Sequence, residues 1–188
     1  GYNVDVLEKK DINFKTLKNY DALVFGVRAF NIDKSLTQLK SEVMRYIEDG
    51  GNVILQYNTS SRWNSLDLND FLPHKLQISR NRVSEEDALV RIINPKHPAL
   101  NIPNKVSMDD FEGWVQERGL YFPNEWSENY NTLISSNDKG EGPNDGGILI
   151  SKIGKGHFVY TSYSWFRQLP AGVPGAYKIF SNLLSLGK

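Results

Sequence analysis

The first third of the chain alternates short apolar runs with a helical pattern. Residues 1–7 alternate apolar and polar positions as a strand does, and residues 22–27 form a near-continuous apolar run. Residues 52–56 form a second run of this kind, which is typical of a strand covered on both faces. Between the two runs, Asp33 can cap a helix that two consecutive glycines end. This order predicts a parallel sheet in which residues 22–27 and 52–56 are adjacent inner strands.

The remainder of the chain favours shorter strands and one closing helix. We expect strands at residues 75–79, 88–93, 132–135, 147–153 and 157–161, the last two joined in a late β-hairpin by Gly154, Lys155 and Gly156. A helix begins near Pro174 and places its apolar residues on one face. The sequence therefore predicts an α/β fold, with a mainly parallel sheet flanked by helices and a late hairpin, as one domain over residues 1–188.

Composition and charge exclude several classes of partner. The 22 basic and 22 acidic residues balance, which removes the long-range attraction to phosphate backbones, so we expect no nucleic-acid partner. No apolar stretch approaches the roughly 20 residues that cross a bilayer, so we expect no membrane insertion. Because the strand pattern starts at the first residues without a leader, we expect the chain to be a piece of a longer polypeptide.

Three segments resemble a known superfamily. The run at residues 20–24, the run at residues 50–55 after the capped helix, and the late strand at residues 154–161 together resemble the glutamine amidotransferase-like superfamily, which includes trehalose-utilisation-type proteins. The resemblance implies a flavodoxin-like arrangement of the sheet. It also implies that an amidotransferase would carry a cysteine nucleophile on the turn after residues 52–56, and a histidine after the last strand.

Neither catalytic residue is present at the positions that the resemblance implies. The chain contains no cysteine, which also excludes disulfides and thiolate metal sites. The turn offers only the hydroxyls of Thr59, Ser60 and Ser61, and a hydroxyl needs an adjacent base to act as a nucleophile. Tyr163 and the residues after it occupy the place of the histidine. We therefore expect neither ammonia transfer from glutamine nor serine-hydrolase chemistry.

Two longer motifs resemble a narrower family. Residues 111–123 and 169–177 resemble the C-terminal domain of long bacterial PIG-L (LmbE-like) deacetylase-family proteins. In that family a separate N-terminal domain holds the catalytic zinc. The resemblance implies an accessory domain whose partner is the upstream domain of the parent chain, and it suggests a periplasmic or exported bacterial protein. The parent protein is then expected to be a zinc-dependent N-deacetylase.

Metal and cofactor sites are not expected within this chain. His97 precedes Pro98 without an acidic partner, and His74 and His157 show no ligand spacing relative to it. The glycine-rich segments at residues 140–147 and 154–156 lack both phosphate-loop patterns and are interpreted as turns.

Candidate binding residues fall into two groups. Ligands of open α/β sheets bind at the carboxyl ends of the strands, and by chain order that rim collects Arg28, Gln56, Tyr57, Asn58, Tyr163, Trp165 and Arg167. The second group is an acidic and aromatic segment with Glu112, Trp114, Glu117 and Arg118, whose ring faces and polar groups suit a sugar. The simpler interpretation is that the rim loops seal a vacated site and that the aromatic residues pack a loop onto the sheet.

Three functional hypotheses follow. The leading one is a non-catalytic accessory domain for domain or subunit contacts, with binding of a glycan or another polar small molecule. The second is a carbohydrate-active hydrolase that uses Asp109, Glu112 or Glu117, since glycosidases need two carboxyl groups roughly 5 to 10 Å apart. The third is a purely structural assembly module.

Overall fold

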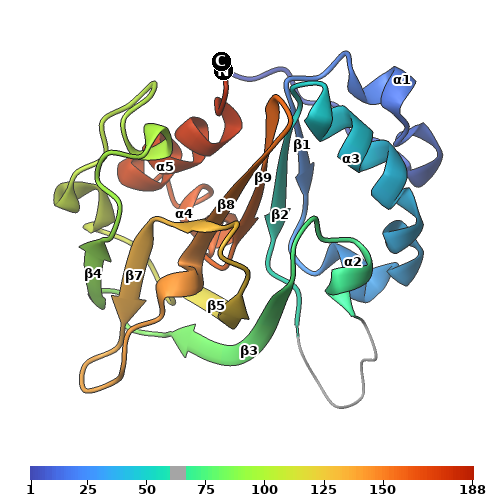
Figure 1. Cartoon of the computed structure of the whole chain (residues 1–188). Coiled ribbons are helices and arrows are strands. Elements are labelled where there is room, and N and C mark those ends of the chain that lie inside the picture. Colours follow the sequence, from blue (N-terminus) through green and yellow to red (C-terminus); the bar gives the residue numbers. More distant parts are fainter. Residues whose placement is uncertain (60–66) are drawn as a thin grey trace.

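The computed structural model describes residues 1–59 and 67–188. Its main sheet has five strands, in the spatial order β1 (Ala22–Phe25), β2 (Asn52–Gln56), β9 (Gly156–Thr161), β8 (Ile148–Ile153) and β6 (Asn131–Thr132) (Figure 1). Strands β1, β2 and β9 run parallel, β8 pairs antiparallel with β9, and β6 pairs antiparallel with β8. The predicted α/β class with a late hairpin is confirmed, since β8 and β9 pair from residue 148 to residue 161.

Helices cover both faces of the sheet because the central parallel strands bury apolar side chains on both faces. On β2, Val53 and Leu55 contribute to one core, while Ile54 contributes to the other, as the two-residue period of a strand requires. The first core is covered by α1 (Phe14–Leu17), α2 (Ala29–Ile32) and α3 (Lys40–Glu48). The second is covered by α4 (Trp165–Gln168) and α5 (Pro174–Leu184), which lie on the opposite side in Figure 1.

Local signals set the helix boundaries where the sequence placed them. Asp33 accepts a hydrogen bond from the Ser35 N–H at 2.9 Å, and Gly50 adopts a left-handed φ of 119° after α3. The helical segment between them starts as a 3-10 helix and continues as α3. The described 3-10 helices are η1 (Lys9–Asp11), η2 (Lys34–Leu39), η3 (Leu68–Asp70), η4 (Pro98–Leu100), η5 (Met108–Phe111) and η6 (Asp145–Gly147). None of the helices in the described ranges has the length and apolar character needed to span a bilayer.

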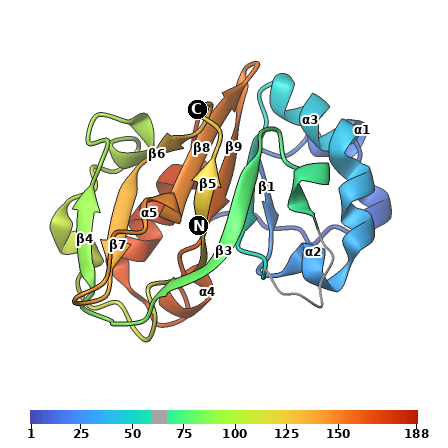
Figure 2. The same ribbon diagram turned by 60° about the horizontal axis from the view of Figure 1, so that its bottom comes forward.

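Two small antiparallel sheets extend the molecule beside the main one. Strand β3 (Leu76–Val83) pairs with β5 (Gly119–Trp126), and β4 (Leu89–Ile92) pairs with β7 (Ile134–Asn137), as Figure 2 shows. The expected strand at residues 75–79 is longer than predicted, and β5 was not predicted. The single strand expected at residues 132–135 is two strands, because β6 joins the main sheet while β7 joins β4.

Two expectations about the N-terminal third are wrong. Residues 1–7 form no strand, and Val4 and Val6 are 80% and 97% exposed, because alternation alone does not supply a neighbouring strand. Strand β1 is an edge strand rather than an inner one, since only β2 pairs with it among the described residues. It also ends at Phe25, and Val24 is 39% exposed. The adjacent and parallel pairing of β1 with β2 is confirmed.

Candidate functional site

The carboxyl ends of the parallel strands are fastened together by backbone and amide hydrogen bonds. Gln56 and Thr161 are register partners at the ends of β2 and β9. The Arg28 N–H donates to the Tyr57 carbonyl at 2.9 Å, and the Phe30 N–H donates to Oδ1 of Asn58 at 3.0 Å. Asn58 is fully buried, so this predicted ligand residue holds the α2 loop against the end of β2.

Tyr57 lies at the centre of the rim. Its ring stacks on Tyr121 at a centroid distance of 5.7 Å and meets Phe166 edge-on at 6.1 Å. Burial raises the pKa of Tyr57, Glu117 raises it further, and Arg28 and Arg167 lower it. The charges of Glu117, Arg28 and Arg167 therefore all act on the buried Tyr57 hydroxyl.

An ion pair closes the outer side of this cluster. Nε of Arg167 donates to Oε1 of Glu117 at 2.6 Å, with the two side chains 33% and 17% exposed. The Arg167 guanidinium also lies 4.9 Å from the centroid of the Phe166 ring. Phe166 is 39% exposed, so an aromatic edge and a charged pair face solvent together. We call Arg28, Tyr57, Glu117, Phe166 and Arg167 the rim cluster.

The backbone of the rim is strained at two positions. Arg28 and Tyr121 adopt left-handed φ values of 60° and 55°, which residues other than glycine rarely occupy. Such conformations persist where surrounding contacts hold them, and they concentrate at functional sites. Gln56 is also unusual, because its Oε1 is buried without a hydrogen-bond partner in the described part of the chain.

Tyr163 and Trp165 follow β9, where the superfamily resemblance implies a histidine, and their side chains are packed into the core. The Tyr163 hydroxyl donates to Oγ of Ser136 at 3.2 Å, and burial raises the pKa of Tyr163 to about 12. Nε1 of Trp165 donates to Oγ1 of Thr161 at 3.0 Å. Both side chains are at most 1% exposed, so this part of the rim is packed with side chains.

Trp114 and Arg118 are also buried rather than presented to solvent. Nε1 of Trp114 donates to the Asp110 carbonyl at 2.9 Å, and its ring packs on Trp165 at 5.6 Å. Nη1 of Arg118 donates to the Phe111 carbonyl at 2.9 Å, and burial lowers the pKa of Arg118. Both side chains therefore attach the loop before β5 to the core beside the rim.

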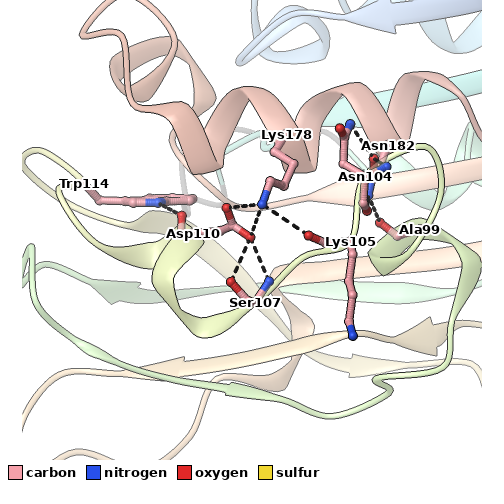
Figure 3. A network of polar contacts seen from close by, with 8 residues as sticks. All are labelled: Ala99, Asn104, Lys105, Ser107, Asp110, Trp114, Lys178 and Asn182. Atoms are coloured by element: carbon pink, nitrogen blue, oxygen red, sulfur yellow. Dashed lines mark hydrogen bonds and ion pairs between the residues drawn. The ribbon is translucent and has the colours of Figure 1, made fainter.

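The predicted acidic residues are dispersed. Asp109 and Glu112 are exposed, and Glu117 belongs to the rim ion pair. Their neighbour Asp110 forms an ion pair of 2.7 Å with Lys178 on α5 and accepts a hydrogen bond from the Ser107 N–H, as Figure 3 shows. Asp110 thus fastens η5 to α5, and the network in Figure 3 is a structural one.

The cysteine and histidine that the superfamily resemblance implies for an amidotransferase do not occur among the described residues of the rim. Thr59 donates its N–H to Oδ1 of Asn31 at 2.7 Å, while Ser60 and Ser61 lie outside the described residues. His157 is the second residue of β9, at the opposite end of that strand from the rim, and His74 packs edge-on against Tyr130. No group of three or more His, Cys, Asp or Glu side chains within residues 1–59 and 67–188 is arranged to hold a metal ion.

Sequence reasoning missed Phe166 and Gln168. Gln168 is fully buried, and its amide accepts from the Val115 N–H at 2.9 Å and donates to the Val115 carbonyl at 2.8 Å, which fixes the loop that carries Glu117. The sequence does carry a signal for Phe166, which directly precedes the predicted ligand residue Arg167. An aromatic residue next to an arginine after a buried strand is a candidate for the same binding surface.

Comparisons with known proteins bear on the fold. No family model matches the chain, and no curated protein sequence matches it. A cytoplasmic protein from Salmonella typhimurium is similar in structure, with a TM-score of 0.58 at 13% identity over 92% of this chain and 74% of that one. A ThuA-like protein from Bacteroides uniformis gives a TM-score of 0.55 at 14% identity, over 97% of this chain and 77% of that one.

A third similar structure belongs to a much longer chain. A β-galactosidase from Rahnella sp. R3 gives a TM-score of 0.53 at 12% identity over 89% of this chain but only 22% of that one. These structural similarities show an α/β fold that resembles that of ThuA-like proteins, and they show nothing about activity.

Proposed function

We propose that this chain is a non-catalytic recognition domain that binds a polar ligand, a glycan, on the rim cluster. The observation that carries the proposal is the division of the rim into a filled interior and a charged, aromatic surface. Tyr57, Tyr163 and Trp165 are 5% exposed or less, whereas Phe166, Arg28 and Arg167 remain accessible in part. A filled interior leaves no cavity in which a substrate could be enclosed, and the surface has groups that can bind polar molecules.

Recognition is favoured over hydrolysis by the state of the reactive groups. Acyl transfer needs a nucleophile beside a base, and Tyr163 occupies the position at which the superfamily resemblance implies the base. Glycoside hydrolysis needs two carboxyl groups that face a common substrate. Glu117 already binds Arg167, and Asp109 and Glu112 lie on the exposed segment around η5.

A sugar fits the rim cluster by its chemistry. The exposed part of the Phe166 ring can contact the apolar face of a pyranose, while Arg167, Glu117 and Arg28 supply donors and acceptors for hydroxyl groups. The similar β-galactosidase supports this choice in a limited way, because the fold there forms about a fifth of a carbohydrate-acting chain.

The resemblance to PIG-L family proteins gives the domain a context. In this proposal the chain is the C-terminal accessory domain of a longer bacterial protein, and its partner within that protein is the upstream deacetylase domain. A purely structural assembly module is the second candidate, and the filled interior of the rim favours it, since packing alone explains the burial of Tyr163 and Trp165.

A glycan array followed by calorimetric titration of the best ligand tests the proposal. We expect binding that Arg167→Ala weakens about tenfold, because charged contacts of this kind contribute roughly 1.5 to 3 kcal/mol. Arg45→Ala is the matched control, since Arg45 also lies over an aromatic ring, 4.1 Å from the centroid of Phe14, but on α3. An array without ligands, or equal weakening by both variants, would contradict glycan recognition and favour the assembly module.

A further inference from the structure

A cavity of about 410 Å³ lies at the end of the sheet opposite the rim. Its floor is formed by neighbouring strands whose facing residues are register partners. Asn131 pairs with Ile150 and Lys152 pairs with His157, and residues directly opposite each other in antiparallel strands point to the same face. His97 of the turn before η4 and Leu186 after α5 complete the wall.

The ionisable side chains that line this cavity are all basic. Its lining contains Lys152, His97 and His157, together with the amide of Asn131, and it contains no aspartate or glutamate. Lys188 is also in the lining, but its ammonium pairs with Asp21 at 2.6 Å. Lys152 has no such carboxylate partner among the described residues. The charge around the cavity is therefore positive, although the net charge of the whole chain is zero.

The two histidines present defined hydrogen-bonding atoms. Nδ1 of His97 accepts from the Ala99 N–H at 3.1 Å, so the proton of the neutral ring sits on Nε2, which is then a donor. Nδ1 of His157 is buried without a hydrogen-bond partner in the described residues. Burial lowers the pKa of both rings, and positive neighbours lower it further, Lys152 for His157 and His157 for His97. A bound anion would relieve this repulsion.

We propose that this cavity binds a small organic anion, a carboxylate attached to a short apolar body. The carboxylate lies among Lys152, His97 and His157, and the apolar body contacts Ile150, Ile102 and Leu186, which line the same space. A metal ion is disfavoured, because the Lys152 ammonium repels a cation and the lining offers no carboxylate ligand.

Titrations monitored by NMR of the histidine side chains test this site. Benzoate is the probe, with benzyl alcohol as its uncharged analogue and inorganic phosphate as an anion without an apolar body. We expect benzoate to shift the signals of His97 and His157 in the millimolar range, about 4 kcal/mol of binding free energy. His74 lies outside the cavity lining and is the internal control.

Matched variants separate the cavity from general surface charge. Lys152→Met should weaken benzoate binding about tenfold, the loss of one charge-assisted contact. Lys155→Met removes the same charge from the β8–β9 turn outside the cavity lining and should leave binding unchanged. His97→Asn retains an acceptor for the Ala99 N–H and should weaken binding by removing the ring.

Four outcomes would overturn the proposal. They are the absence of histidine shifts with benzoate, equal affinity for benzyl alcohol, equal affinity for phosphate, and equal weakening by Lys155→Met. The first would show that the cavity does not bind benzoate, and the second that binding does not need a negative charge. The third would show that binding does not need an apolar body, and the fourth that Lys152 has no specific role. None of them depends on whether the rim cluster binds a glycan.

Discussion

Trp165 is the largest fully buried side chain of the described residues, and it stands at the junction of the rim with the core. Its ring packs on Trp114, Tyr163 and Phe180 at centroid distances of 5.6, 5.8 and 5.7 Å. Because three rigid aromatic rings surround it, the site has little freedom to collapse when the indole is removed.

Trp165→Ala is therefore expected to lower the free energy of unfolding by about 3 to 5 kcal/mol. Denaturant unfolding monitored by circular dichroism measures the change. Phe166→Ala is the control, since it truncates the adjacent aromatic residue, which is 39% exposed, and should cost much less. A similar small loss in both variants would mean that the rim interior is loosely packed.

The connection between η5 and α5 is so close that only glycine fits at residue 175. A Cβ at Gly175 would lie 1.8 Å from the Asp110 carbonyl oxygen, and the clash is with backbone that cannot rotate away. The same Asp110 binds Lys178 one turn further along α5. Both contacts fix where this helix starts on the sheet.

Gly175→Ala is expected to destabilise the protein by about 1 to 3 kcal/mol or more, because α5 must shift away from η5 to accept the methyl group. Thermal unfolding measures it. Gly142→Ala is the matched control, since a Cβ there meets no atom within 4 Å and the residue does not require a positive φ. Equal melting temperatures for the two variants would refute the close approach.

Elements defined by continuous apolar runs were predictable, whereas elements defined by distant pairing were not. Strands β2 and β9 and helix α5 follow from local patterns. The two strands are buried along nearly their whole length, and the helix buries one face at helical spacing. The division between β6 and β7 depends on which strand lies alongside, and the sequence of residues 131–137 carries no sign of that change. Strand β5 was hidden for the same reason, since its pairing with β3 contains register shifts.

The candidate site was predictable to the extent that chain order determines it. The C-terminal ends of β2 and β9 meet as predicted, which brings Tyr57 to 6.1 Å from Phe166 across about a hundred residues of sequence. Residue type did not reveal which side chains face inward. Trp165 and Phe166 are neighbours in sequence, yet one is 1% exposed and the other 39%, because successive residues of α4 point in different directions.

At the scale of the whole molecule, tyrosines buried in both cores link stability to alkaline pH. Tyr46 points from α3 into one core and donates to the Tyr20 carbonyl at 2.9 Å, and Tyr163 lies in the opposite core. Burial raises the pKa of each to about 12, from an ordinary value of about 10. Burial in the folded state therefore disfavours ionisation of the Tyr46 and Tyr163 hydroxyls, one in the core on each face of the sheet.

The sign of the effect follows from linkage. A group whose pKa is higher in the folded state contributes stability that is complete below its unfolded pKa, here about 10, and that is lost as the pH rises through about 12. We therefore expect the free energy of unfolding to fall between these values. Denaturant titrations across that range measure the fall, and in the Tyr46→Phe, Tyr163→Phe double variant it should be smaller. The variant also loses two hydrogen bonds, so the slopes with pH are compared rather than the absolute stabilities. An unchanged slope in the double variant would show that these tyrosines are not the groups whose ionisation opposes folding.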